Sequence, residues 1–359
     1  MKKNILFIQT NQFGYHTDTF QAAKNLCCQF NVFLICMNYG NKRIKIDGVK
    51  VIYVSRKGGK ITRLFRLFII CIDNIRKTKY HVVFINYFLS CFIIKLFDKK
   101  TTMILDFRTG DVNGNKFNMY LKNCLCLLES FFFKHITVIS ESLINKLHLP
   151  KQKCHVLPLG ANKIVDQEKS FETLNLLYIG TFHNRNINYT IEGFARFLKE
   201  YGSEAEANYH IIGFGSRKEE EEIHSSIKKY GQNDKIQFHG RIHGEKVKPF
   251  FEKCNIGVSF IPITNYFNCQ PPTKTFEYLA NGMAVIATAT DENKKIINES
   301  NGMLTKDTAE DFYKGLKKLY LNRASYDSQK IIEDSTSFNW KTIWKKNFQT
   351  YLKKITKKK

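Results

Sequence analysis

The chain has 359 residues and a formal net charge of +24, and its length suits two ordinary domains with separate apolar cores. Hydrophobic residues make up 43% of the chain and charged residues 25%, with a mean hydropathy of -0.31. These values exclude a small disulfide-stapled module and a wholly disordered chain.

The positive charge is concentrated in the first half of the chain. Residues 1–165 hold 26 basic and 8 acidic side chains, whereas residues 166–359 hold 30 and 24. An excess of this size predicts a negatively charged partner or surface for the first half. The sequence has no aromatic-plus-basic RNA motif and no zinc-ligand spacing, so nucleic acid is not the partner that we expect.

Hydropathy predicts a cytoplasmic protein without a membrane span. The apolar run at residues 5–8 is too short for the core of a signal peptide. The most apolar window, residues 82–97, is interrupted by Asn86 and Lys95 and falls short of the ~20 residues that span a bilayer. The ten cysteines form no C-x-x-C pair, which predicts reduced thiols.

Short apolar runs alternate with helical patterns in the first half. A helix is predicted at residues 19–28, and strands at residues 3–9, 31–37, 49–54, 82–86, 102–106 and 136–139. Fully apolar strands that alternate with helices predict a parallel sheet covered on both faces. A last short strand and a Pro/Gly loop within residues 155–164 mark the expected joint to a second domain.

The same pattern restarts in the second half. Strands are predicted at residues 174–180, 209–213, 235–238, 257–261 and 284–288, and helices at residues 188–201, 218–230, 246–254 and 273–280. We therefore predict an α/β protein with two Rossmann-like, doubly wound domains facing a cleft, residues 1–164 and 165–335. The segment 336–359 is amphipathic, and we expect it to pack back on the first domain as a helix.

Candidate chemistry is expected in the loops that follow strands, because ligands of open parallel sheets bind outside the carboxyl ends of the strands. Four loops qualify: residues 10–17, 106–115, 180–186 and 265–274.

The strongest local signal is QPPTKTFEYLANGMAVIATAT at residues 270–290, where a proline pair precedes a helix that leads into a buried strand. The unpaired N–H groups of a helix start attract phosphate oxygens, and Lys274 in the first turn adds a full charge. Glu277 lies one turn later on the same side and can accept hydrogen bonds from the hydroxyls of a ribose. From these residues alone, an ordinary surface lysine and a solvated glutamate remain an open alternative.

Residues 170–345 resemble the nucleotide-sugar domain of the retaining glycosyltransferases of family 4, which have the two-domain GT-B fold. The resemblance lies in LLYIGTFHNRNINYTIEGF (176–194), HIIGFG (210–215), IQFHGRI (236–242), CNIGVSFIP (254–262) and PTKTFEYLANGMAVIAT (272–288). The first half matches in outline only, through VISESLINKL (138–147) and HVLPLGAN (155–162).

The resemblance implies roles for individual residues. Glu277 stands at the family's second conserved glutamate, which holds the ribose, and Arg185 stands where the family usually has a lysine that binds the diphosphate. With Lys274, Arg185 would neutralise the charge on the leaving nucleoside diphosphate. The other donor contacts that we expect are Gly14, Gly180, Gly213, Gly240, Arg241 and Thr275.

Two positions depart from the family pattern. The first conserved glutamate is replaced by Cys269, and the arginine after the strand glycine is replaced by Thr181. In the first half, Asp106 is the catalytic candidate, while His16, Asp18 and Arg108 are candidates for contacts with the acceptor or the transferred sugar. No catalytic histidine carries over, and the leaving phosphate is the expected base.

A basic amphipathic helix is predicted within residues 56–79, where Lys60, Arg63 and Arg66 alternate with apolar residues. This pattern favours docking on an anionic membrane surface and hence a lipid-linked acceptor. The alternative is a core helix with a solvated basic face.

The resemblance thus implies a retaining glycosyltransferase of the hexosyltransferase class, peripheral at the inner face of the membrane and working in the assembly of a surface polysaccharide, for example lipopolysaccharide. Its donor would be a UDP- or GDP-sugar and its acceptor a glycan or lipid-linked sugar, with no metal or other cofactor. The alternatives are a sugar-nucleotide epimerase of similar fold and a non-catalytic basic membrane-binding protein on a transferase scaffold.

Overall fold

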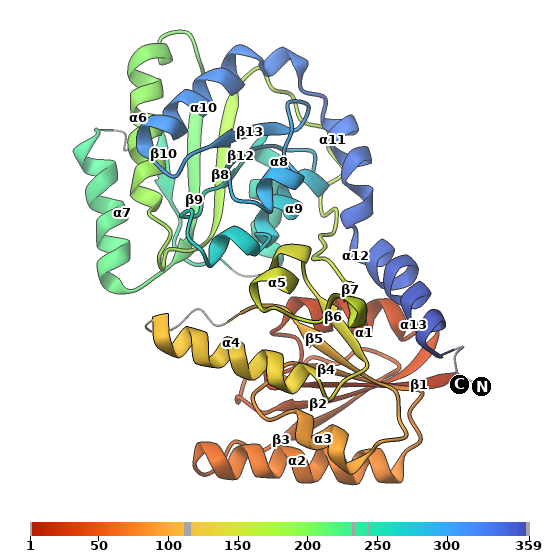
Figure 1. Ribbon diagram of the computed structural model, residues 1–359. Helices are drawn as coiled ribbons and strands as arrows, with labels where there is room; N and C mark the ends of the chain where they lie inside the picture. Colours follow the sequence, from red (N-terminus) through yellow and green to blue (C-terminus); the bar gives the residue numbers. More distant parts are fainter. Residues whose placement is uncertain (1, 111–115, 232–233, 243, 357–359) are drawn as a thin grey trace. The chain divides into compact units, whose positions relative to one another are not determined.

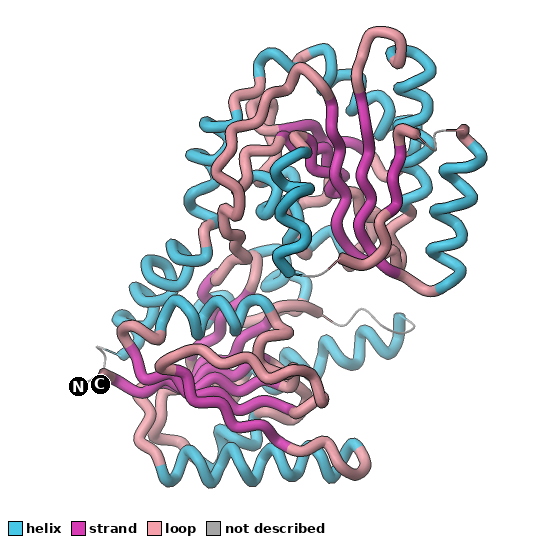
Figure 2. Tube along the Cα trace, turned by 180° about the vertical axis from the view of Figure 1, so that it is seen from behind, coloured by secondary structure: helices cyan, strands magenta, loops and turns pink. Residues whose placement is uncertain are grey.

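The computed structural model describes residues 2–110, 116–231, 234–242 and 244–356 (Figure 1). The chain divides into two compact units, each built around one parallel sheet. Unit 1 comprises Met1–Leu159 and Trp340–Lys359, and unit 2 comprises Gly160–Asn339. Figure 2 shows the strands of each sheet in magenta with helices packed around them.

The sheet of unit 1 has seven parallel strands in the order β3-β2-β1-β4-β5-β6-β7. They are β1 (Lys3–Gln9), β2 (Phe30–Met37), β3 (Val49–Val54), β4 (Val82–Asn86), β5 (Met103–Phe107), β6 (His135–Val138) and β7 (Cys154–Val156). The apolar runs form the strands because both faces of a parallel sheet are buried, so nearly every residue of β1, β4 and β5 is out of contact with water.

Five helices connect these strands: α1 (Thr17–Leu26), α2 (Lys60–Lys77), α3 (Phe92–Phe97), α4 (Lys116–Ser130) and α5 (Glu141–Lys146), with the short 3-10 turn η1 (Lys151–Lys153) before β7. Right-handed crossovers place α2, α3 and α4 on one face of the sheet and α1 on the other. Helix α1 begins two residues earlier than predicted, with Asp18 in its first turn, and ends at Leu26 rather than at residue 28.

The end of the chain packs inside unit 1. It forms α12 (Trp340–Thr342), the π-helical turn η7 (Ile343–Phe348) and α13 (Gln349–Thr356), while residues 357–359 lie outside the described residues. The ring centroids of Trp344 and Phe348 lie 6.2 and 5.7 Å from that of Phe84 on β4. Trp344 also packs edge-on against Phe7 on β1. These buried aromatic rings, together with contacts to α1, cover the second face of the sheet.

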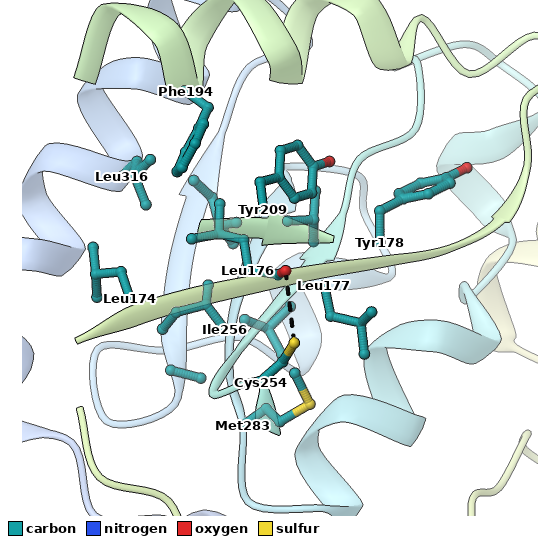
Figure 3. Close-up of a cluster of buried hydrophobic side chains, with 14 of the residues drawn as sticks. Leu174, Leu176, Leu177, Tyr178, Phe194, Tyr209, Cys254, Ile256, Met283 and Leu316 are labelled. Atoms are coloured by element: carbon teal, nitrogen blue, oxygen red, sulfur yellow. Dashed lines mark hydrogen bonds between the residues drawn. The ribbon is translucent and has the colours of Figure 1, made fainter. Parts of the chain in front are cut away.

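The sheet of unit 2 has six parallel strands in the order β10-β9-β8-β11-β12-β13. They are β8 (Leu174–Thr181), β9 (Ala207–Phe214), β10 (Ile236–Phe238), β11 (Ile256–Ser259), β12 (Ala284–Thr288) and β13 (Gly302–Thr305). Strand β13 was not predicted from the sequence. Figure 3 shows the core around β8, with Phe194 and Tyr209 on one side of the strand and Leu177, Cys254 and Met283 on the other.

The longer helices of unit 2 are α6 (Ile187–Tyr201), α7 (Arg217–Lys229), α8 (Lys248–Lys253), α9 (Thr273–Ala280), α10 (Ala309–Leu321) and α11 (Ser328–Asp334). The 3-10 turns are η2 (Gly244–Val247), η3 (Phe267–Cys269), η4 (Asn293–Lys295), η5 (Arg323–Ser325) and η6 (Ser335–Phe338). A capping box of Ser216 and Glu219 fixes the start of α7. The predicted α/β architecture with two Rossmann-like sheets is confirmed.

Candidate active site

Lys274 lies in the first turn of α9, and its side chain folds inward over the sheet. The Nζ atom lies 3.8 Å from the centroid of the Tyr178 ring on β8 and has no hydrogen-bond partner among the described residues. It also lies 3.1 Å from the point that a Cβ on residue 180 would occupy, so Gly180 leaves the space that the amine fills. Burial and the nearby Arg185 guanidinium hold the pKa of Lys274 well below its usual value.

Arg185 approaches the same place from the loop after β8. Two residues in left-handed conformation, Asn184 and Asn186, shape this loop. The guanidinium lies 4.2 Å from the centroid of the Phe267 ring, and its Nη1 atom donates to the carbonyl oxygens of His183 and Asn184 at 3.3 Å each. Burial lowers the pKa of Arg185. The two predicted cations therefore converge beside Tyr178.

Glu277 is the carboxylate of this cluster. It lies one turn after Lys274 on α9, and its side-chain oxygens accept no hydrogen bond from the described residues. Burial raises the pKa of Glu277, and the Lys274 amine offsets part of the increase. The Arg185 guanidinium and the Lys274 amine thus share a partly buried place with a single carboxylate, and a diphosphate supplies the negative charge that would hold both groups protonated.

The Thr275 side chain makes its hydrogen bonds within the protein. Its hydroxyl lies 2.7 Å from Ser259 Oγ at the end of β11 and donates to Asn293 Oδ1 at 3.1 Å, and the residue is fully buried. These bonds anchor the start of α9 to the carboxyl edge of the sheet, so they hold Lys274 in place. Its predicted contact with a donor stays a prediction.

Three of the predicted glycines lie together at the same edge. Gly180 and Gly213 are paired in the ladder between β8 and β9, and the N–H of Gly213 donates to the carbonyl oxygen of Gly240 at 2.9 Å. A Cβ on residue 213 would lie 2.2 Å from the carbonyl oxygen of Gly180, so only glycine fits. Arg241 follows directly, with its guanidinium 4.1 Å from the centroid of the Phe214 ring.

Cys269 ends the turn η3 with its side chain turned into the protein. The thiol lies within weak hydrogen-bond distance of the carbonyl oxygen of Tyr266, at 3.3 Å. A buried thiol in this position does not replace a carboxylate, but the turn brings Phe267 under Arg185. The sequence did not identify Phe267 and Tyr178 as the rings beneath the two cations. The sequence signal for Tyr178 was an aromatic residue within an apolar strand.

A second polar cluster lies in unit 1, at the carboxyl ends of β1, β4 and β5. Arg108 donates through Nε to Asp106 at 2.8 Å, pairs with Asp18 at 3.3 Å, and donates through Nη1 to the carbonyl oxygen of Leu157 at 2.7 Å. Its Nη2 atom is buried, and no group in the described part of the chain pairs with it. Burial alone would lower the pKa of Arg108, but the two carboxylates raise it.

Asp106 is completely enclosed by this cluster. It accepts hydrogen bonds from Thr137 Oγ1 at 2.7 Å and from Asn86 Nδ2 at 3.1 Å in addition to Arg108. Burial raises the pKa of Asp106, and the Arg108 guanidinium opposes this increase. With every one of these donors directed at it, Asp106 orients Arg108, and its role as a catalytic group stays a prediction.

The cluster borders a pocket of about 140 Å³, which is also lined by His16, Tyr87 and Gln9. Gln9 Oε1, like Arg108 Nη2, is buried and has no hydrogen-bond partner among the described residues. The amide, imidazole and hydroxyl side chains of the lining, among them Asn11, His16 and Thr109, can exchange hydrogen bonds with sugar hydroxyls. Of the predicted loop 106–115, residues 111–115 lie outside the described residues.

Gly14 lies in the loop after β1 and belongs to unit 1. Its φ of 90° and a Cβ position only 2.4 Å from Ile44 Cδ1 explain why glycine is needed there. The predicted contact of Gly14 with a donor stays a prediction.

Comparison with known proteins adds to this geometry. Residues 173–322 match the family model of Glycosyl transferases group 1. The chain has the fold of GT-B glycosyltransferases. A search of curated proteins finds no match.

Solved structures of low identity share this fold over nearly the whole chain. Sucrose-phosphate synthase from Thermosynechococcus elongatus superposes with a TM-score of 0.76 at 14% identity, covering 99% of this chain and 100% of that one. The lipopolysaccharide outer core galactosyltransferase WaaB gives 0.72 at 16% identity, covering 99% and 100%. HepE of Anabaena, solved with UDP and glucose, gives 0.71 at 10% identity, covering 97% and 99%. The match of residues 173–322 to this family model supports glycosyltransferase activity, and the solved structures support the fold.

The described helices include none that is both long and apolar enough to cross a bilayer. The described residues also hold no group of three or more His, Cys, Asp or Glu side chains that could bind a metal ion.

Proposed function

We propose that this protein is a retaining glycosyltransferase that moves a hexose-type sugar from a UDP- or GDP-sugar to a glycan or lipid-linked acceptor. The observation that carries the proposal is the convergence of Lys274 and Arg185 at the start of α9, with Glu277 beside them. A buried amine without a hydrogen-bond partner is costly to the folded protein, and a diphosphate oxygen is the partner that it lacks.

In this proposal the diphosphate lies against the first turn of α9 and the ribose hydroxyls donate to Glu277. The bond between the anomeric carbon and the β-phosphate oxygen breaks, and the bonding electrons leave on the nucleoside diphosphate. Lys274 and Arg185 neutralise this charge in a site of low dielectric constant, which lowers the barrier. An acceptor hydroxyl oxygen then bonds to the anomeric carbon on the same face, and its proton passes to the departing phosphate.

The names of the neighbours support the donor class. HepE has been solved in complex with UDP-glucose, and WaaB is a galactosyltransferase of the lipopolysaccharide outer core. A nucleotide-sugar donor and a role in the assembly of a surface polysaccharide follow as proposals for this chain. The pocket beside Arg108 in unit 1, with its polar lining, is the place that we propose for a sugar hydroxyl of the acceptor.

We also propose that the protein works at the inner face of a membrane. Helix α2 carries the predicted basic side chains, but Arg63 and Arg66 donate to backbone carbonyl oxygens of Gly58 and Ser55. Replacing these arginines would therefore disturb the loop as well as the charge. Lys60→Glu changes the charge at an exposed position and is the cleaner test of electrostatic attraction to anionic vesicles.

The donor experiment measures binding of UDP, GDP and their sugars to the full-length protein by calorimetry. Arg185→Ala is expected to weaken nucleotide binding at least about tenfold, because one charge-assisted contact contributes about 1.5–3 kcal/mol. The matched control is Arg217→Ala, an exposed arginine on α7 in the same unit. Equal nucleotide affinity in Arg185→Ala and wild type would refute the assignment.

Product analysis separates transfer from its alternatives. A transferase consumes the donor with its acceptor and forms a glycoside, whereas a sugar-nucleotide epimerase converts the donor alone. A non-catalytic scaffold protein does neither.

A further inference from the structure

We propose that α2, α3 and α4 of unit 1 together form an apolar face that inserts into the headgroup region of an anionic bilayer. This deepens the membrane association proposed above, because it adds an inserting surface to electrostatic attraction. The proposal needs no assumption about the donor site.

Exposed apolar side chains are concentrated on these helices. Of the 21 large hydrophobic residues that are exposed in the described part of the chain, ten lie on α2, α3 or α4, and two more directly follow α4. Single exposed hydrophobic residues are ordinary, but a concentration on adjoining helices marks a surface that meets another apolar phase.

Helix α4 contributes most of this apolar face. Cys126 and Ser130 point inward, and the exposed apolar residues recur at helical spacing along one stripe: Phe117, Tyr120, Leu121, Leu125 and Leu128. Phe117 and Tyr120 are each 67% exposed and Leu128 is 57% exposed. A helix on the surface of a soluble domain normally carries charged groups at such positions, so this stripe needs an apolar environment.

Helix α2 has two apolar stripes. One stripe, with Leu67, Phe68 and Cys71, is buried against the unit, while Ile61, Phe65 and Ile69 form the other and are exposed. The sequence allowed two interpretations of this segment. The interpretation as a core helix fits the buried stripe, and the interpretation as a membrane-surface helix concerns the exposed stripe.

Helix α3 joins the two into one apolar face. It lies beside α2 (Figure 1), and its Phe92 stacks on Phe132, just after α4, at 4.7 Å between ring centroids. Its exposed Leu96 and Phe97 continue the apolar face between α2 and α4.

Cations accompany this face and identify its partner. Residues 60–100 hold nine lysines and arginines and two aspartates. Arg76 lies 5.9 Å from the ring centroid of Phe97, and Lys153 lies 5.6 Å from that of Phe131. Basic side chains beside inserted aromatic rings suit anionic headgroups above acyl chains. A second copy of a chain with net charge +24 would instead bring like charges together.

The test measures co-flotation of the full-length protein with vesicles of equal parts phosphatidylcholine and phosphatidylglycerol. We expect Leu128→Ser and Phe117→Ser each to weaken vesicle binding by about tenfold, because each removes one inserted apolar side chain. The matched control is Leu321→Ser at the end of α10 in unit 2, where the leucine is 58% exposed. It should bind like wild type, and all three variants should keep wild-type melting temperatures and UDP affinity.

The fluorescence of an introduced tryptophan measures insertion into the bilayer directly. The native Trp340 and Trp344 are buried and give a constant background. The emission of Phe117→Trp should shift to the blue and be quenched by brominated lipid, whereas that of Leu321→Trp should not. The proposal is overturned if Phe117→Trp is not quenched, or if Leu128→Ser binds vesicles as tightly as Leu321→Ser does. It is also overturned if the free protein is a dimer that Leu128→Ser dissociates, because a second copy would then cover the apolar face.

Discussion

Replacing Lys274 by methionine should stabilise the free protein and weaken nucleotide binding at the same time. The methionine keeps the length and the apolar stem of the side chain but removes an amine that is buried on Tyr178 without a hydrogen-bond partner. Replacing a buried charge by an apolar group of similar volume is neutral or stabilising by about 1–4 kcal/mol. We expect about 1 kcal/mol here, since Glu277 loses a favourable neighbour, and hence a melting temperature higher by about 2–4 °C.

The same variant should lose a charge-assisted contact with the diphosphate. Such contacts contribute about 1.5–3 kcal/mol, so the Kd for UDP should rise by about 10- to 150-fold. Differential scanning calorimetry measures the first effect and titration calorimetry the second. The control is Lys218→Met on α7, whose side chain is 86% exposed and which should change neither quantity.

The buried Lys274 amine should make the stability of the protein depend on pH. Burial and Arg185 hold the pKa of Lys274 well below 10.5 in the folded protein. At pH values between this lowered pKa and 10.5, the unfolded chain therefore holds more protons than the folded protein does. Wild type should therefore gain stability relative to Lys274→Met as pH rises through this window. A variant that is less stable than wild type, together with an unchanged Kd for UDP, would refute the assignment of Lys274.

Three other outcomes follow from the same structure. Glu277→Gln should weaken UDP binding by about 5- to 10-fold, the equivalent of about 1 kcal/mol per hydrogen bond, and leave pyrophosphate binding unchanged, because the carboxylate is assigned to the ribose; equal losses for both ligands in calorimetry would count against that role. Gly213→Ala should lower the melting temperature markedly, because the added Cβ would lie 2.2 Å from the Gly180 carbonyl oxygen, whereas Gly59→Ala, with open space around it, should melt like wild type; similar melting of the two variants would contradict the close approach. Burial lowers the pKa of His210 to about 4, so the neutral imidazole favours folding, and this contribution is lost as pH falls from 6.5 toward 4. Between pH 7 and pH 5, the free energy of unfolding of wild type should therefore fall by about 2 kcal/mol more than that of His210→Gln. Urea titrations in which both proteins lose the same stability would rule this out.

The sequence was enough to predict the two parallel sheets, because continuous apolar runs such as those of β1, β4 and β12 are buried on both faces. It was not enough for β13, whose four residues include one exposed leucine and begin with a glycine. The pattern also could not fix the bounds of α1, where Asp18 falls inside the first turn instead of before the helix.

The site residues of unit 2 could be listed from the resemblance, but their environment could not. Arg185 and Lys274 are 89 positions apart along the chain, and only the packing of η3 and α9 at the sheet edge places both beside Tyr178. The burial of the Lys274 amine depends on the space above Gly180, which no local pattern encodes. In the same way, the enclosure of Asp106 depends on donors from β4 and β6.

The apolar face of unit 1 was only partly visible in the sequence. The basic residues of α2 indicated a membrane surface, but α4 has ordinary helical spacing that is typical of a core helix. Only the structure shows that the stripe from Phe117 to Leu128 has no protein covering it among the described residues.

A crystal structure of the protein soaked with UDP or GDP tests the central claim most directly. We predict that the β-phosphate lies within hydrogen-bond distance of Lys274 Nζ and Arg185, with the ribose hydroxyls against Glu277. A nucleotide bound elsewhere, with the Lys274 amine still without a partner above Tyr178, would contradict the account.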